Sequence, residues 1–343
     1  MLEKPDLQDQ LIIDRLQDEY GLQVTQVTFL PLGYDVNTAV YRLVTEHETE
    51  YFLKLRKGAF NEMTAAIPQF LKAQGIQAII SPLMNRKRRL WGNLQDYKII
   101  LYPFIQGKNG YEVALSDQHC IDFGVAIKGI HTAEVPPAFR PLIQHESYSS
   151  HWREIVRTFQ AQAEYTPFED STAAKLAEFM QAKRGEIRHM VERAEQLGLA
   201  LQARSLEFVL CHSDLHPGNL LIGENDASGH SLLYIVDWDN PILAPKERDL
   251  MFIGMSRASA GAREEALFYQ GYSGDCGCAL AEADQMALAY YRYERIIQDI
   301  AAFCEQLFLT VEGGEDREQA YQYFISQFLP NHEVETACKT DQV

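Results

Sequence analysis

A short stretch with strand character, residues 207–237, interrupts a long series of helical segments and carries a dense group of polar residues. It includes HSDLHPGN (212–219), in which Pro217 and Gly218 break regular structure. The apolar run LLYIV (232–236) follows, and it ends directly at Asp237. The stretch therefore predicts a loop and then a buried strand, which together bring several polar side chains to one place.

Three of these residues suit phosphoryl transfer. Asn219 comes five positions after Asp214, and Asp237 comes eighteen positions after Asn219. The reaction needs an acceptor for the proton of the attacking hydroxyl and positive charge against the transferred phosphate. Asp214 can orient the hydroxyl and take its proton. Asn219 and Asp237 offer the oxygen ligands that Mg²⁺ prefers, so we predict that they hold this ion against the nucleotide phosphates.

The first 105 residues predict a small lobe of α+β type. Apolar residues at helical spacing predict an amphipathic helix that ends near Gly21. Alternating and β-branched residues then predict five antiparallel strands with one helix inserted among them. The expected strands cover 24–30, 39–45, 50–55, about 79–84 and 97–105, and the expected helix covers 63–74.

Residues 106–343 predict a larger, mainly helical lobe. Helical periodicity dominates most of it, and the β-rich stretch 207–237 is the exception. The expected helices cover 116–132, 150–164, 171–200, 262–271, 280–310 and 315–328. A β-rich lobe joined by a short connector to a helical lobe is a layout typical of kinases.

Charge and apolar content exclude several classes of protein. The net charge of −17 repels phosphate backbones and anionic membranes, so we expect no nucleic acid and no membrane as partner. The longest apolar stretch, IILYPFI (99–105), is far shorter than the roughly 20 residues that cross a bilayer. The polar N-terminal segment has no signal-peptide core. We therefore expect a cytoplasmic protein, as a monomer or weak dimer.

The polar motifs resemble those of a known family. HxDxxxxN, followed by an apolar run and an Asp-apolar-acid triplet, resembles the catalytic loop and metal motif of protein kinases. HSDLHPGN together with DWD (237–239) resembles the aminoglycoside phosphotransferase family, and the resemblance runs from about residue 7 to about 328. It implies a bilobal protein-kinase-like fold. The small five-stranded lobe would bind the nucleotide, and the larger helical lobe would carry catalysis and substrate binding.

The resemblance also implies nucleotide-binding residues in the small lobe. Lys54 lies where the family keeps the lysine that contacts the α- and β-phosphates, and strand alternation turns it away from its apolar neighbours. Glu62 is its expected ion-pair partner, although Pro68 disturbs the helix that should carry this glutamate. Gly33 lies in the expected phosphate-covering loop. Pro103, Phe104 and Ile105 lie in the expected interlobe hinge, which would meet the base of ATP or GTP.

Three further segments resemble spectinomycin phosphotransferases: WREIVRTF (152–159), APKERDLMFIG (244–254) and YYRYERIIQDIA (290–301). They imply phosphorylation of a hydroxyl on an aminocyclitol or aminoglycoside antibiotic, with spectinomycin as the leading candidate and antibiotic resistance as the outcome. Asp239, Glu294 and Asp299 are candidates to contact this amine-bearing substrate. Salt-bridge roles remain open for the two acids of 290–301, and a metal-neighbour role remains open for Asp239.

Three other interpretations remain at this point. A metabolite kinase of the same fold would phosphorylate homoserine, choline or a sugar. A zinc enzyme could use His212, Asp214 and His216, which alternate along an extended segment. A nucleotide-binding module without activity would be expected to lack one of the four residues predicted to bind phosphate, metal or the reacting hydroxyl, and the sequence keeps all four.

Overall fold

The computed structural model describes residues 4–33, 37–224, 229, 231–255, 259–274, 283–310 and 314–342. The chain forms two compact units: Met1–Gln144 with His212–Pro241, and His145–Cys211 with Ile242–Val343. The motif residues between 212 and 239 therefore belong to the same unit as the N-terminal strands. The predicted lobes, 1–105 and 106–343, follow the change in type of secondary structure along the chain. The boundary between these lobes stays a prediction.

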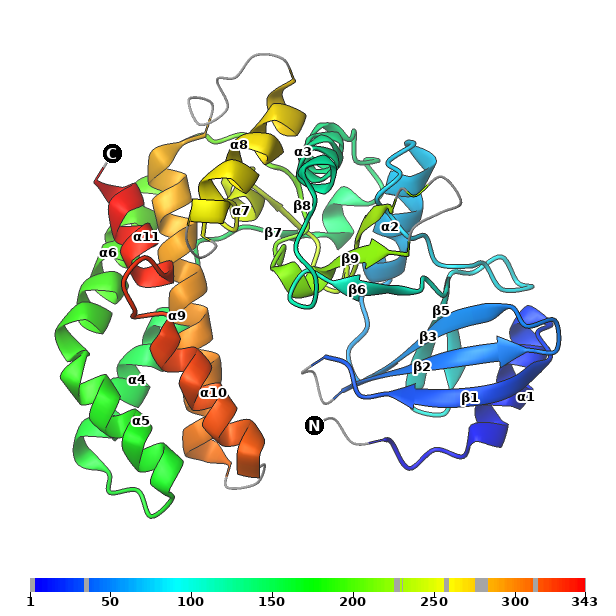
Figure 1. The fold of residues 1–343 in the computed structure, drawn as a ribbon, viewed down its shortest axis with the longest axis horizontal. Helices are drawn as coiled ribbons and strands as arrows, with labels where there is room; N and C mark the ends of the chain where they lie inside the picture. The colour runs from blue at the N-terminus through cyan, green and yellow to red at the C-terminus, as the bar shows by residue number, and fades with distance from the viewer. Residues whose placement is uncertain are drawn as a thin grey trace. The chain divides into compact units, whose positions relative to one another are not determined.

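The first unit contains a five-stranded antiparallel sheet in the order β1-β2-β3-β5-β4 (Figure 1). The first three strands begin and end within two residues of the predicted ranges. The elements up to the end of this sheet are α1 (Asp9–Tyr20), β1 (Val24–Leu30), β2 (Thr38–Thr45), β3 (Glu50–Lys57), α2 (Met63–Ala73), β4 (Gly92–Leu94) and β5 (Tyr97–Pro103).

One face of this sheet forms the core of the small lobe. Leu53 and Leu55 of β3 are fully buried there, against Ile12 and Leu16 of helix α1. The odd-numbered residues of β3 thus point toward α1. Because side chains alternate along a strand, Lys54 and its even-numbered neighbours project from the opposite face.

The strand expected around 79–84 is wrong. This segment contributes only an isolated bridge between Ile79 and Ile235, and the sheet takes its remaining strand from β4 instead. Pro82 explains part of the difference, because it has no N–H to offer a ladder. The next residue, Leu83, makes a single backbone bond to Leu101 (2.7 Å), after which the chain turns at Asn85.

A second, three-stranded sheet in the order β10-β9-β6 completes the first unit. Gly107 begins β6, and a Cβ placed there would lie 2.3 Å from the carbonyl oxygen of Ile222, so only glycine allows this close pairing. The remaining elements of this unit are β6 (Gly107–Asn109), α3 (Asp117–Thr132), the 3₁₀ turns η1 (Arg140–Leu142) and η2 (Pro217–Asn219), β9 (Leu220–Gly223) and β10 (Leu233–Ile235). The short β7 (Gln144–His145) lies where the unit ends.

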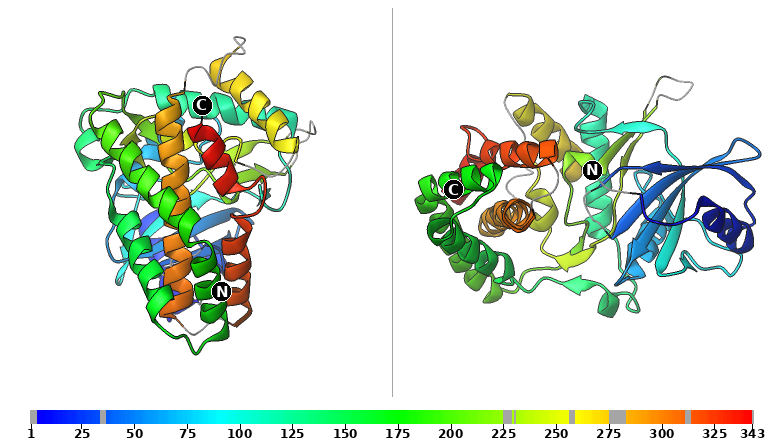
Figure 2. Two further views of the ribbon diagram at one scale, coloured as in Figure 1. Left: turned by 90° about the vertical axis from the view of Figure 1, so that its left-hand side faces the viewer. Right: turned by 90° about the horizontal axis from the view of Figure 1, so that it is seen from below.

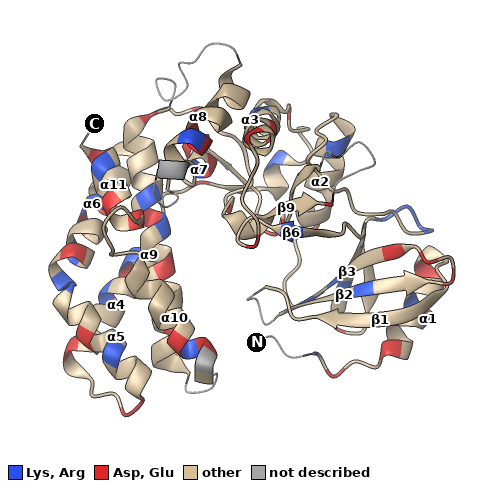
Figure 3. Ribbon diagram, in the orientation of Figure 1, with Lys and Arg blue, Asp and Glu red and all other residues tan. Residues whose placement is uncertain are grey.

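The second unit is mainly helical, as predicted. Its helix α9 is 25 residues long and packs against α4, α6 and α11 (Figure 2). Acidic and basic residues are interspersed along α4, α5 and α6 (Figure 3). The elements are α4 (His151–Tyr165), α5 (Ser171–Ala182), α6 (Arg184–Gln202), β8 (Val209–Cys211), β11 (Ile242–Ala244), α7 (Glu247–Leu250), α8 (Ser259–Ser273), α9 (Gln285–Leu309), α10 (Gly314–Ser326) and α11 (Glu333–Asp341). Within the residues that the structure describes, no helix combines the length and apolar character needed to span a bilayer.

Candidate functional site

Lys54 connects the five-stranded sheet to the DWD segment. It lies on β3, where Val40 and Ile100 of the flanking strands pair with it. Its ammonium nitrogen donates to Oδ1 of Asp237 at 2.9 Å and to Oδ1 of Asp239 at 2.6 Å. The structure therefore brings together two distant regions of sequence, since Lys54 and Asp237 are 183 residues apart.

These ion pairs shift the pKa values of both partners. Burial lowers the pKa of Lys54, but the charges of Asp237 and Asp239 outweigh it, so the pKa is raised above its usual value. Burial raises the pKa of Asp237, but the charge and hydrogen bond of Lys54 outweigh that, so the pKa is lowered. The ammonium and the carboxylate are therefore both charged at neutral pH.

Arg56 belongs to the same cluster, and the sequence prediction missed it. Its guanidinium pairs with Oδ2 of Asp239, while Lys54 bonds the other oxygen of that carboxylate. Strand alternation could have found this residue, since positions 54 and 56 share a face of β3. Asp239 was predicted to contact the substrate, with a metal-neighbour role left open; in the structure its carboxylate spans the two cations of Lys54 and Arg56.

His212 ties the motif loop to the end of strand β10. The N–H of Asp214 donates to Nδ1 of His212 (3.3 Å), so Nε2 carries the proton and donates to the carbonyl of Val236 (2.9 Å). The ring of Trp238 packs edge-on against this imidazole, with centroids 4.6 Å apart. His212 thereby fixes the loop that carries Asp214 next to the segment that carries Asp237.

Asn219 is held at the other end of the loop. It is 7% exposed, and its Nδ2 donates to the backbone carbonyl of Asp214 at 2.8 Å. Because the amide nitrogen is used in this bond, the amide oxygen is the end that points elsewhere and can ligate a cation. The N–H of Val236 donates to the carbonyl of Asn219 (3.0 Å), which links the turn η2 to the DWD segment.

Two residues beside the candidate catalytic groups have unusual backbone angles. Ser213 has φ 75° and Asp237 has φ 65°, in the left-handed region that side chains other than glycine rarely adopt. The hydroxyl of Ser213 donates to the carbonyl of Asn240 (2.9 Å), which helps to hold its conformation. Such angles persist only where surrounding contacts over-determine them, and they are frequent at active sites.

The zinc interpretation does not fit this geometry. Zinc needs an imidazole nitrogen with an available lone pair, but Nδ1 of His212 accepts a hydrogen bond and its Nε2 is protonated. Nδ1 of His216 accepts from the N–H of Gly218 (3.1 Å), and its Nε2 lies 3.6 Å from Oδ2 of Asp214. The two histidines therefore organise the loop.

The predicted ion pair between Lys54 and Glu62 is not formed in the described part of the chain. Glu62 is exposed and lies at the residue before helix α2, whose first residue is Met63. Pro68 is inside this helix, so the helix does not begin at the proline, yet the glutamate still precedes its first turn. Lys54 takes its carboxylate partners from the DWD segment instead.

The predicted nucleotide-loop and hinge residues lie at the two ends of the sheet strands. Gly33 has φ 91° in the β1–β2 loop, of which residues 34–36 lie outside the described chain. Pro103 ends β5, and Phe104 and Ile105 connect it to β6. The N–H of Phe104 donates to the carbonyl of Glu50 (3.3 Å), whereas the N–H of Ile105 meets no protein acceptor within the residues described.

The two substrate candidates in helix α9 are both paired with arginines of the second unit. Glu294 is 5% exposed and forms a buried ion pair with Arg153. Asp299 pairs with Arg295, one helical turn earlier, at 3.1 Å. These ion pairs match the salt-bridge roles left open for both acids, and their contact with a substrate stays a prediction.

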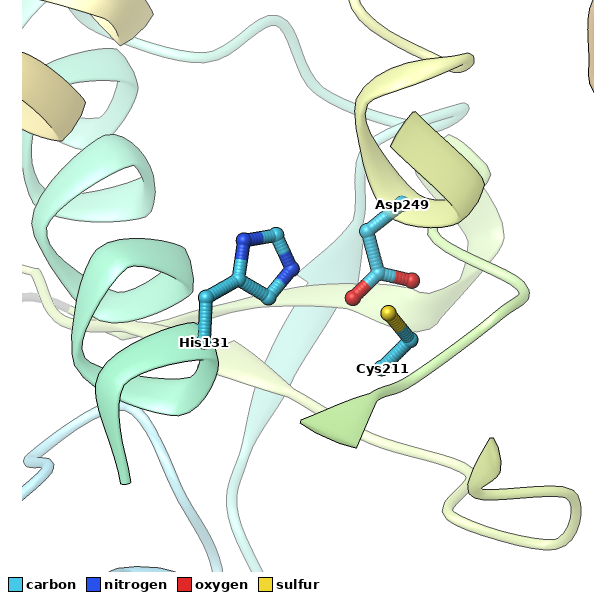
Figure 4. Close-up of side chains that lie close together, drawn as sticks. All are labelled: His131, Cys211 and Asp249. Atoms are coloured by element: carbon cyan, nitrogen blue, oxygen red, sulfur yellow. The ribbon is translucent and has the colours of Figure 1, made fainter. Parts of the chain in front are cut away.

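Two further features of the second unit show no link to this site. Arg292 lines one cavity of this unit and Arg153 lines another, and no residue of 212–219 or 237–239 lines either of them. Cys211 ends β8 beside Asp249 of α7 (Figure 4). Burial, and then the charge of Asp249, raises the pKa of the Cys211 thiol well above its usual value, so this thiol is neutral and unreactive. His131, also labelled in Figure 4, is a buried residue of α3 in the first unit.

The chain is similar to known proteins over most of its length. Residues 28–283 match the profile of the phosphotransferase enzyme family. A structure of spectinomycin phosphotransferase with ADP and spectinomycin is 35% identical, covers 99% of this chain and 100% of its own, and has a TM-score of 0.87. An AMP-bound spectinomycin phosphotransferase is 34% identical, with coverages of 96% and 97% and a TM-score of 0.81.

More distant similarity concerns the fold alone. An amicoumacin kinase with AMP-PNP and Ca²⁺ is 14% identical over 95% of both chains, with a TM-score of 0.61. No curated protein sequence matches the chain. Together with the five-stranded sheet and the helical remainder, these likenesses confirm the predicted kinase-like α+β fold class.

Proposed function

Because the chain belongs to the phosphotransferase enzyme family, we propose that it transfers a phosphoryl group from ATP to a hydroxyl of an aminocyclitol antibiotic, with spectinomycin as the acceptor. The observation that carries this proposal is the contact between Lys54 and Asp237. It joins a lysine suited to phosphate oxygens to a carboxylate suited to a divalent cation. Asp214 and Asn219 are attached to the same segment by hydrogen bonds, so all four residues belong to one connected arrangement.

Asp214, Lys54 and His212 each have a role in the proposed reaction. Asp214 accepts the proton of the acceptor hydroxyl as the hydroxyl oxygen attacks the γ-phosphorus, and the bond from this phosphorus to the β,γ-bridging oxygen breaks to release ADP. Its side chain is 40% exposed, so a substrate can reach it. Lys54 is 11% exposed, and its fixed ammonium positions the phosphate oxygens of the donor. His212 keeps the loop in the conformation that presents Asp214.

The donor set fits a magnesium ion. Asn219 offers an amide oxygen, since its nitrogen bonds the carbonyl of Asp214, and Asp237 offers a carboxylate held in its charged form. Hard oxygen ligands of this kind suit Mg²⁺. When bound, the ion neutralises charge on the phosphate oxygens and orients them for transfer.

Two features support ATP as the donor. The two similar spectinomycin phosphotransferase structures contain the adenine nucleotides ADP and AMP. In this chain, Pro103 ends β5 of the five-stranded sheet, and Phe104 and Ile105 come directly after it. We propose that the N–H of Ile105 donates to the purine, because the N–H of Phe104 is already bonded to Glu50. Gly33, in the β1–β2 loop, would allow the backbone at that position to approach the phosphates closely.

The choice of acceptor rests on the full-length likeness to spectinomycin phosphotransferase. The net charge of −17 also favours a diamine over an anionic acceptor. A coupled ATP-turnover screen tests the choice, with spectinomycin, other aminoglycosides, homoserine, choline and ethanolamine as acceptors. We expect turnover with spectinomycin and little with the rest. Turnover with an amino alcohol and none with spectinomycin would make the protein a metabolite kinase and refute the proposed acceptor.

A further inference from the structure

We propose that Arg56 is a positioning residue for the donor nucleotide: it holds Asp239, and Asp239 in turn fixes the ammonium of Lys54. The inference rests on the proposed phosphoryl transfer and deepens it. It gives Asp239 a place at the phosphate end of the site in place of the substrate contact predicted from the sequence.

The geometry of the three side chains is that of a bridge. Lys54 and Arg56 project from the same face of β3, two residues apart. Asp239 bonds the first cation with Oδ1 at 2.6 Å and the second with Oδ2. A carboxylate bonded through both oxygens to two cations on one strand cannot rotate freely, so it defines where the ammonium lies.

Because its side chains are largely buried, this bridge affects the net charge met by the phosphates as well as the position of the ammonium. The side chains of Lys54, Asp239 and Arg56 are 11%, 17% and 23% exposed. Charges at such positions are screened much less than charges on the surface. With Asp237 included, the cluster holds two cations and two carboxylates, and its net charge is zero. Without Arg56 the same place has one cation and two carboxylates, a net charge of −1 where phosphates must bind.

The net charge of the cluster distinguishes a positioning role of Arg56 from its direct contact with the nucleotide. In Arg56→Gln, Asp239 keeps its charge with only the lysine to balance it, and it competes with the phosphates for Lys54. Adding Asp239→Asn returns the cluster to one cation and one carboxylate. If Arg56 acts through Asp239, the second substitution therefore repairs part of what the first one damages. If Arg56 itself bonds the phosphates, it does not.

The experiment measures KM for MgATP, KM for spectinomycin and kcat in Arg56→Gln, Arg56→Lys, Asp239→Asn and the double variant. Loss of one charged contact predicts about a tenfold rise in the KM for MgATP in Arg56→Gln, with the KM for spectinomycin within about twofold of wild type. Arg56→Lys should lie between the two, because it keeps the charge and loses the forked geometry. The double variant should recover to within about threefold of wild type.

Arg193→Gln is the matched control, since Arg193 forms a comparable pair with Asp341 in the second unit, at 2.7 Å through two nitrogens. It should leave the KM for MgATP unchanged, and melting temperatures show whether each variant is folded. A double variant as impaired as Arg56→Gln would overturn the positioning role. A selective rise in the spectinomycin KM in Asp239→Asn would return Asp239 to the acceptor site and overturn it as well.

Direct titration of MgATP binding separates this inference from the proposed function. If no acceptor is turned over but the variants keep the expected order of MgATP affinity, the proposed reaction fails and the role of Arg56 stands. If wild type turns over spectinomycin and all variants bind MgATP equally, the proposed reaction stands and the role of Arg56 fails. A wild-type protein that does not bind MgATP would overturn both.

Discussion

Replacing Lys54 by methionine tests the centre of the proposed site, because the two residues differ mainly in charge. The ammonium lies 2.9 Å from the carboxylate of Asp237, so phosphates bound with a metal at that carboxylate come close to it. Two unit charges about 4 Å apart attract each other by about 4 kcal/mol at an effective dielectric constant of about 20. We therefore expect kcat/KM for ATP to fall by roughly 10²–10³-fold.

The same substitution should cost much less in stability. Asp239 keeps Arg56 as partner, and the Asp237 side chain is 48% exposed and can be hydrated. The expected loss is about 1–3 kcal/mol, seen as a small shift in melting temperature. The coupled ATP-turnover assay with spectinomycin measures the rate, with Lys54→Arg as the control that keeps the charge. A Lys54→Met protein within about threefold of wild type in kcat/KM would refute the assigned role.

The pH dependence of this stability difference has a definite sign. The pKa of Asp237 is lowered in the folded protein, because the charge of Lys54 outweighs burial. The ion pair therefore contributes stability at pH values above the ordinary aspartate pKa of about 3.9, and the contribution is lost as pH falls through the lowered pKa. The gap in melting temperature between wild type and Lys54→Met should narrow below about pH 4. A gap that widens there would contradict the pairing.

Asn219→Ala should raise the Mg²⁺ concentration for half-maximal activity about tenfold, whereas Asn219→Asp, which keeps an oxygen ligand, should need less extra Mg²⁺. An unchanged Mg²⁺ requirement in both would remove Asn219 from the metal site. Glu294→Gln should lower the melting temperature by about 5 °C or more, because it leaves the charge of Arg153 buried without its partner, while the KM for MgATP stays the same. A higher spectinomycin KM at unchanged melting temperature would instead restore its predicted substrate role. Glu62→Ala should keep activity within about twofold of wild type, and a loss like that of Lys54→Met would show that the two residues pair during turnover.

Much of the sheet was predictable because local signals determine it. Alternation gave the first three strands, and it correctly turned Lys54 away from Leu53 and Leu55. The strand expected at 79–84 was predicted from its apolar residues. It does not form because Pro82 and the following turn prevent a ladder. Strand β4 has only three residues, Gly92–Leu94, and so carries no periodic signal.

The partners of charged residues were harder to predict, because they depend on contacts between distant segments. The position of Arg56 on the face of Lys54 follows from strand alternation, but its bond to Asp239 depends on how the DWD segment meets β3. Glu294 lies on a helix whose sequence does not reveal Arg153 on another helix. Analogy with protein kinases predicted an ion pair between Glu62 and Lys54, but in the structure Lys54 pairs with the carboxylates of the DWD segment.

The proposal that Asp214 takes the proton of an acceptor hydroxyl is tested most directly by the product itself. Purified protein is incubated with MgATP and spectinomycin, and the antibiotic is then examined by mass spectrometry and ³¹P NMR, in wild type and in Asp214→Asn. We expect wild type to form a singly phosphorylated spectinomycin, and Asp214→Asn to form it about 10²–10⁴-fold more slowly while MgATP affinity stays within about twofold. Phosphorylated product formed at the wild-type rate by Asp214→Asn, or its absence with wild type, would contradict the proposed reaction.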